Sequence, residues 1–254
     1  MSSLAARMYG VIRHPRVTFT AILQAPSWAP VLVATTTITF LCGMGFLRTE
    51  VGRQALVDQW ERTAIAFGQP VDDASYARME ETSSNGSFSV LYAAATALAN
   101  GPVLVIGISG LLFFVLNRRS GADRGNDRGG DRGSERGPDL SGPRYLHLLT
   151  VVSYAGVILA LRQVIATPVD YVRESIASPT TLVQFFTMLD ESSPLARFLG
   201  VIDLFVVWWI VVLAIGVSVL YQRPTRRLAL AFTGAYVALA LLAALVMAVS
   251  GGTA

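Results

Sequence analysis

Asp203 and Arg162 have the clearest chemical potential in this sequence, because both fall within long apolar stretches. A charged side chain in the hydrocarbon layer is costly unless it is paired, neutralised or turned towards water. Asp203 lies near the start of the fourth apolar stretch and Arg162 near the end of the third. If the two stretches are antiparallel helices, both side chains lie at a comparable depth, and the sequence predicts an ion pair between them.

Two interpretations of this predicted pair remain open. In the first, Asp203 belongs to an ion or substrate path. In the second, the pair fixes the register of two helices, and the stem of Arg162 lies along apolar surface while its guanidinium reaches the interface. We expect no second carboxylate within the membrane, so a proton relay would lack its other station. The structural interpretation is therefore favoured.

Other polar residues in the apolar stretches could line a cavity. Asn100 precedes a Gly-Pro pair in the second stretch, a combination expected to kink or break a helix. Ser153 and Tyr154 place two hydroxyl groups inside the third stretch. Such hydroxyl groups usually hydrogen-bond to neighbouring helices. Alternatively, the same three residues and Asp203 would line the path of a small transporter, channel or permease subunit.

Ser109 lies in Gly107-Ile108-Ser109-Gly110, which resembles the G-x-S-G nucleophile loop of rhomboid-type intramembrane proteases. Its only plausible base is His147. Ser109 is expected roughly 12 Å inside its helix, at 1.5 Å per residue, whereas His147 lies at the edge of the next span. Small residues also let membrane helices approach closely. We therefore favour helix packing and expect no catalytic residue.

The sequence also predicts no metal centre and no cofactor. Cys42 is the only cysteine, which excludes an intrachain disulfide and a cysteine-based metal site. The two histidines, His14 and His147, are remote in sequence and show no clustered ligand spacing. We therefore expect a protein that is not an enzyme.

Composition places these residues in a bundle of membrane-spanning helices. Apolar residues make up 53% of the chain, charged residues only 15%, and the mean hydropathy is +0.52. The apolar residues gather in five stretches close to the ~20 residues that a helix needs to cross a bilayer. The sequence predicts an all-α polytopic membrane protein with a five-transmembrane-helix bundle. The expected spans are Ala29–Leu47, Ser89–Leu116, Tyr145–Ile165, Phe198–Leu220 and Leu228–Ser250.

The segments outside the spans divide the chain further. Residues 1–28 are expected to carry a short interfacial helix before the first span. Residues 29–116 hold the first two spans, joined by an external loop, 48–88, with an amphipathic helix. Residues 117–144 repeat Asp-Arg-Gly or Glu-Arg-Gly units, which predicts a disordered cytoplasmic linker. Residues 145–254 contain the last three spans.

The arginine distribution predicts the orientation in the membrane. All 20 basic residues are arginines; thirteen precede the first span or lie in the second and fourth loops, against seven in the alternate segments. Because cytoplasmic loops carry the excess of positive charge, we expect a cytoplasmic N-terminus and an external C-terminus in a bacterial inner membrane. Each linker repeat carries a carboxylate beside its arginine, which argues against nucleic-acid binding.

Three segments resemble bacterial members of the Yip family of integral membrane proteins. The residues that carry the resemblance are Pro15, Phe19, Ile22 and Pro26-Ser27-Trp28 before the first span; Gly142 to Tyr154 at the start of the third; and Leu195, Asp203-Leu204-Phe205, Trp208 and Gly216 around the fourth.

The resemblance implies a five-helix membrane protein without known catalytic residues, whose eukaryotic relatives take part in vesicle traffic. It leads us to expect association with other membrane proteins or self-association, or organisation of the lipid bilayer. Two departures argue against GTPase binding: the N-terminus is short, and Asp139-Leu140-Ser141-Gly142-Pro143, similar to a family motif usually placed before the first span, follows the second.

Overall fold

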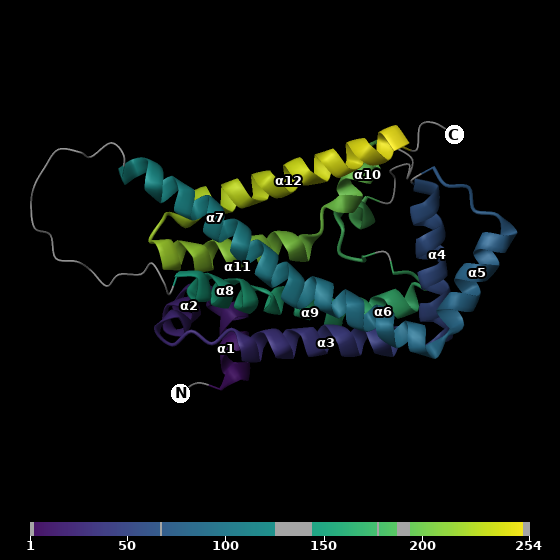
Figure 1. Ribbon diagram of the computed structural model, residues 1–254, viewed down its shortest axis with the longest axis horizontal. Coiled ribbons are helices and arrows are strands. Elements are labelled where there is room, and N and C mark those ends of the chain that lie inside the picture. The colour runs from purple at the N-terminus through teal and green to yellow at the C-terminus, as the bar shows by residue number, and fades with distance from the viewer. Residues whose placement is uncertain (1–2, 67, 125–143, 177, 187–193, 251–254) are drawn as a thin grey trace, which may run out of the picture.

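The computed structural model describes the chain except residues 1–2, 67, 125–143, 177, 187–193 and 251–254 (Figure 1). The described elements are helices, apart from one isolated β-bridge between Thr181 and Asp203. In chain order they are α1 (Leu4–Arg13), α2 (Pro15–Gln24), α3 (Ala29–Leu47), α4 (Glu50–Ala66), α5 (Asp73–Ser84), α6 (Gly86–Leu98), the π-helix η1 (Ala99–Val103), α7 (Leu104–Arg124), α8 (Arg144–Ala155), α9 (Val157–Val172), the 3-10 helix η2 (Leu182–Phe185), α10 (Pro194–Val201), α11 (Leu204–Tyr221) and α12 (Thr225–Ser250).

Five segments among the described residues are long and apolar enough to cross a membrane, which confirms the predicted fold class. They run roughly along the long axis of the molecule, with α1 and α2 at one end and α4 and α5 at the other (Figure 1). The chain is therefore an integral membrane protein. The five segments are Ala29–Leu47, Gly86–Leu116, Tyr145–Val172, Leu204–Tyr221 and Thr225–Val246.

The span formed by α8 and α9 is the centre of the bundle. α8 contacts α7 and α11, and α9 contacts α3 and α11. Leu148, Tyr154 and Ile158 are completely buried in this span, and α2 adds Phe19 and Ile22 to the same core. Because lipid tails are as apolar as these side chains, close packing rather than hydrophobicity holds such helices together.

A second, smaller core holds α4 against α3 and α6. Leu56 of α4 is fully buried beside Phe46 of α3. Trp60 makes edge-on ring contacts with two aromatic residues of α6, Phe88 at 5.7 Å and Tyr92 at 6.1 Å between centroids. α4 is thus packed on the bundle, at the end opposite α1 and α2 (Figure 1).

The second span passes through its Asn-Gly-Pro sequence without ending. Residues Ala99–Val103 form a π-helical turn that contains Pro102 and joins α6 directly to α7. A wider turn of this kind accommodates a local mismatch in hydrogen bonding while the helix continues. The predicted disturbance is therefore present, but it is a bulge and not a break.

The segments before and between the first two spans hold more helix than predicted. α1 precedes α2, which begins at Pro15 because proline is well suited to the first turn of a helix. α5 follows α4 between the first two spans. Asp72 caps the start of α5 by accepting the N–H of Ser75. α7 continues to Arg124, and the rest of the predicted linker, 125–143, lies outside the described residues.

Two later spans differ from their predicted bounds. The third was expected to end at Ile165, but α9 continues to Val172. The fourth was expected to start at Phe198, but α10 ends at Val201 and α11 starts at Leu204. The fourth span is confirmed as Leu204–Tyr221, but its predicted start is wrong, because a break at Asp203 separates α10 from α11.

Gly52, in the first turn of α4, lies so close to the end of α3 that we predict a strict requirement for glycine at this position. A Cβ atom at position 52 would overlap the backbone carbonyl of Phe46, whereas a Cβ at Gly86 would meet open space. We expect Gly52→Ala to lower the free energy of unfolding by about 1–3 kcal/mol, because backbone must move to relieve the overlap. Chemical denaturation in detergent micelles, followed by tryptophan fluorescence, measures this. Gly86→Ala is the matched control, and equal effects of the two substitutions would contradict the prediction.

Candidate functional site

Asp203 lies at a helix break and not inside a continuous helix, which corrects the expectation from sequence. It is the N-cap of α11, with extended backbone angles of φ −106° and ψ 129°. Its Oδ1 accepts the N–H groups of Phe205 at 2.8 Å and Val206 at 3.4 Å. A carboxylate at this place satisfies otherwise free donors and lies at the positive end of the helix dipole. An aspartate directly before a long apolar run is itself a helix-start signal.

The other oxygen of Asp203 binds three side chains. Oδ2 accepts hydrogen bonds from Arg162 Nε at 2.9 Å, Ser178 Oγ at 2.8 Å and Thr180 Oγ1 at 2.8 Å. Arg162 Nη2 also donates to Ser178 Oγ at 2.8 Å. The structure thus brings Asp203 and Arg162 together, with Asp203 only 5% exposed. Sequence analysis missed Ser178 and Thr180, which lie in an irregular connection without periodicity.

A neighbouring segment satisfies the backbone at the break. The N–H of Leu182 donates to the carbonyl of Ile202 at 2.8 Å, and the N–H of Leu204 donates to the carbonyl of Thr180 at 3.0 Å. These bonds make residues 180–182 a short antiparallel partner of the break. Irregular backbone is tolerated at membrane depth only where protein or water satisfies its polar groups. The connection after α9 therefore satisfies backbone groups at the break between α10 and α11.

A hydroxyl group from α12 satisfies two further backbone groups at the break. Tyr236 accepts the N–H of Asp203 at 3.1 Å and donates its own proton to the carbonyl of Val201 at 2.8 Å. One phenol thereby serves a donor on one side of the break and an acceptor on the other. This contact ties α12 to the polar cluster, although most of α12 is exposed.

The arrangement positions helices and offers no free reactive group. Both oxygens of Asp203 are engaged by donors, and Arg162 uses two of its nitrogens in the same cluster. Proton or ion transfer would require Asp203 to release these partners. The geometry supports the structural interpretation of the pair, in which α9, the connection after it, α11 and α12 are held together.

The remaining predicted polar residues do not form one cavity. Asn100 and Arg162 line a cavity of about 160 Å³ between α3, η1 and α9, and Asp203 is not among its lining residues. Ser153 and Tyr154 lie instead in the core of α8. Ser153 donates to a carbonyl of its own helix at 2.7 Å, and the Tyr154 hydroxyl is buried without a hydrogen-bond partner among the described residues.

The Ser109 hydroxyl is not hydrogen-bonded to a general base among the described residues. Ser109 is fully buried in α7, and its Oγ makes no hydrogen bond within the described part of the chain. An activated serine requires a base within hydrogen-bond reach. The described structure therefore contains no hydrogen bond between Ser109 and His147. Nor do the described residues include a group of three or more histidine, cysteine or acidic side chains that could hold a metal ion.

Asp170 is a buried carboxylate within a span, whereas Asp203 lies one residue before one, which corrects the expectation of no carboxylate in the membrane besides Asp203. Asp170 is 8% exposed and lies in the last turn of α9, inside Tyr145–Val172. A sequence signal was available for it. Gln163, Thr167 and Asp170 recur at helical spacing, so they share one face while the opposite face remains apolar.

Comparison with protein families adds an independent observation. Residues 9–247 match the family model described as Yip1 domain. This match includes all five candidate spans, and with them Asp203, Arg162 and Asp170. No curated protein and no solved structure matches the chain.

The ion pair predicts coupled effects of substitution. We expect Asp203→Asn to lower the free energy of unfolding by about 1–3 kcal/mol, because its amide N–H would face the donors of Arg162. Arg162→Gln should cost less, since the arginine side chain is 30% exposed and Asp203 keeps its other donors. The double variant should cost less than the sum of the two single effects. Denaturation in micelles measures all three, with Glu81→Gln as an exposed control; additive effects would rule out the coupling.

The two hydrogen bonds of Tyr236 at the break predict a loss of stability that is separate from that of the ion pair. Tyr236→Phe removes one hydroxyl but leaves the Asp203 N–H and the Val201 carbonyl without their partner. We expect the free energy of unfolding to fall by about 1–3 kcal/mol and hydrogen exchange to accelerate at residues 201–206. Tyr9→Phe is the matched control, because the Tyr9 hydroxyl only accepts an exposed bond from Arg13. A Tyr236→Phe protein as stable and as protected as the control would show that the cap is dispensable.

Proposed function

Because the chain belongs to the Yip1 domain family, we propose that it is a non-enzymatic membrane protein that acts by association. Its partners are anionic lipids and other proteins at the membrane surface. We place it in a bacterial inner membrane, with α1, α2 and the loop between α11 and α12 on the cytoplasmic side, and we assign it no GTPase partner. The single observation that carries this proposal is a basic face at the end of the bundle where α1 and α2 pack.

The basic face, defined here as α1, α2 and residues 221–227, is held to the bundle by buried apolar side chains. Val11, Phe19 and Ile22 are buried against the bundle. Gly216 of α11 permits this approach, because a Cβ there would lie 3.1 Å from the Phe19 ring and closer still to Val151. The two short helices are therefore packed on the bundle and present their outer side as one surface.

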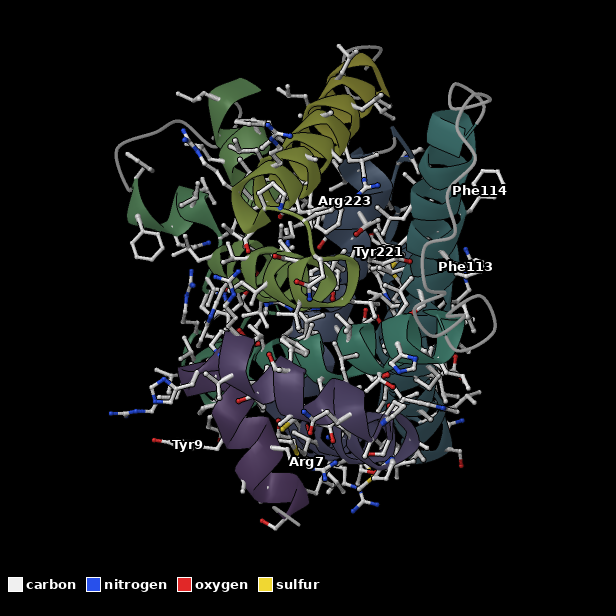
Figure 2. The ribbon with its side chains drawn as sticks, turned by 90° about the vertical axis from the view of Figure 1, so that its left-hand side faces the viewer. Arg7, Tyr9, Phe113, Phe114, Tyr221 and Arg223 are labelled. Atoms are coloured by element: carbon white, nitrogen blue, oxygen red, sulfur yellow. The ribbon has the colours of Figure 1, made fainter. Side chains whose placement is uncertain are left out.

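The exposed side of this face combines apolar and cationic groups. Tyr9 is 59% exposed and Val17 is 74% exposed. Figure 2 looks onto this end of the molecule and shows Arg7 and Tyr9 on α1, with Tyr221 at the end of α11 and Arg223 in the loop after it. No carboxylate occurs in residues 3–49 or 221–227. Such a surface suits the boundary between acyl chains and anionic headgroups.

A cleft in the basic face brings two arginines to one place. Arg16 of α2 and Arg223 line a cleft of about 390 Å³ together with Thr20 and Gln222. The loop is held in shape because Ser218 Oγ donates to the carbonyl of Arg223 at 2.6 Å. Two guanidinium groups at one cleft repel each other unless an anion lies between them. A phosphate group of a lipid or an acidic protein side chain would supply that anion.

The alternative of a transporter, channel or permease subunit receives less support. It required the second-span irregularity and Asp203 to face one cavity. Asn100 and Arg162 do line one cavity, but the span is bulged and not broken, and Asp203, which is bound to Arg162, is not among the lining residues. We therefore retain association as the proposed function.

The basic face predicts selective retention of acidic partners. The full chain would be excised from native membranes in polymer nanodiscs, and the co-isolated lipids and proteins quantified by mass spectrometry. We expect Arg16→Gln/Arg223→Gln to reduce anionic lipids or acidic partner proteins about tenfold or more, because each arginine near the surface contributes ~1 kcal/mol. Partner proteins would be assigned to the face only if a photo-crosslinker at Val17 labels them.

The control for this experiment removes the same charge from the other end. Arg62→Gln/Arg78→Gln changes two exposed arginines on α4 and α5. It should leave the co-isolated partners unchanged. Loss of partners to the same extent in both double variants would show a general charge effect, and no loss in either would remove the basic face as a contact surface.

A further inference from the structure

A second cavity lies between α3, α4, α6 and α9, apart from the basic face. Its volume is about 180 Å³, and its wall is largely apolar, with Phe46, Leu47 and Ile176 among its lining residues. A dry cavity of about 150 Å³ is large enough for a molecule the size of benzene. The space is therefore sufficient for a small organic group as well as for water.

Two unsatisfied acceptors line this cavity. Asp170 Oδ1 and Gln59 Oε1 are buried, and neither has a hydrogen-bond partner among the described residues. Asp170 comes from α9 and Gln59 from α4, so the two acceptors reach the cavity from different sides. Buried polar atoms in native proteins are nearly always satisfied, and exceptions call for a physical reason, such as a site for a ligand.

The two arginines nearest to Asp170 along the chain make their hydrogen bonds and ion pair with other residues. α3 and α6 carry no charged residue. Arg162, eight positions earlier on α9, is bound to Asp203 and Ser178, and Arg173 donates to Gln184 Oε1 at 2.6 Å. Asp170 also lies in the last turn of α9, where the helix carbonyls carry partial negative charge. The site therefore favours a positive charge from outside the chain.

Three of the polar side chains along the cavity wall already donate their protons elsewhere. Thr39 Oγ1 donates to a carbonyl of α3 at 3.0 Å, and Thr167 Oγ1 donates to the carbonyl of Gln163 at 2.8 Å. Gln163 Nε2 in turn donates to Thr167 at 3.3 Å. These groups leave acceptor lone pairs, and not donors, towards the cavity. The two unsatisfied acceptors, Asp170 Oδ1 and Gln59 Oε1, are best matched by a cationic ligand that carries its own N–H or O–H donors.

We propose that this cavity binds the ammonium group of a small primary amine, with Asp170 as its anion, Gln59 as a second acceptor and the apolar wall around its hydrocarbon. A single buried carboxylate is matched by one positive charge, whereas a divalent ion would leave an excess. Three N–H donors on one ammonium group suit several acceptors. The amine is either free in solution or the ethanolamine headgroup of a lipid.

Calorimetric titration of the full chain in phosphatidylcholine nanodiscs with n-propylammonium chloride, at constant ionic strength, tests this site. We expect saturable binding that weakens at least about tenfold in Asp170→Asn, because a charge-assisted hydrogen bond is lost. Gln59→Leu should weaken it several-fold. Asp58→Asn is the matched control, since Asp58 accepts a bond from Gln54 and does not line the cavity.

The choice of ligands separates recognition of a primary ammonium group from the attraction of any cation to a carboxylate. Tetramethylammonium has the charge but no N–H donor, and it should bind much more weakly than n-propylammonium. Equal binding of these two ions, saturation by sodium or potassium alone, or unchanged binding in both Asp170→Asn and Gln59→Leu would overturn the proposal. Because Asp170 Oδ1 is buried without a hydrogen-bond partner among the described residues, Asp170→Asn should unfold no more easily than the wild type, which thermal melting in the same nanodiscs would check.

The source of the amine follows from the lipid. Nanodiscs that contain phosphatidylethanolamine should weaken the apparent affinity for n-propylammonium if the lipid headgroup enters the cavity. An unchanged affinity in those nanodiscs assigns the site to a free amine. Absence of saturable n-propylammonium binding in the phosphatidylcholine nanodiscs, which hold no competing primary amine, would overturn the proposal.

Discussion

A buried break between two helices must have its backbone groups satisfied, and this requirement at Asp203 organises the second half of the chain. At the break before α11, the donors and acceptors are met by Asp203, by residues 180–182 and by the hydroxyl of Tyr236. Since these partners come from separate elements, the break can exist only when α9, its following connection, α11 and α12 are assembled. Arg162 joins the same cluster through the carboxylate, so charge and backbone are satisfied together.

The two buried carboxylates show how surroundings decide what an aspartate does. Asp203 lies at the positive end of a helix dipole and accepts from two backbone N–H groups and three side chains. Asp170 lies at the negative end of another helix, and its Oδ1 has no hydrogen bond from the described residues. The first is therefore suited to hold the bundle together. The second has a buried oxygen without a hydrogen-bond donor among the described residues. Its cavity is therefore the better candidate for a ligand.

The ends of the bundle differ in a way that fits a protein acting through contacts. One end carries α1, α2 and an arginine-bearing loop without a carboxylate, and the other carries α4 and α5 with charges of both signs. The basic face is packed firmly on the core through Phe19 and Ile22. Rigid support of this kind lowers the entropy lost when the surface binds a lipid or protein.

Sequence alone determined the class of protein and the number of spans, because apolar stretches of spanning length report directly on the bilayer. The likeness to the Yip family came from the resemblance of short motifs near the first, third and fourth spans. Sequence also predicted that Asp203 and Arg162 would meet, since their depths in adjacent spans follow from helix length. Only the tertiary structure decided that Asp203 caps a break and that Asp170 is buried. Those outcomes depend on Ser178, Thr180, Tyr236 and Gln59, which are distant in sequence, and local periodicity carries no information on which distant groups will satisfy a buried polar atom.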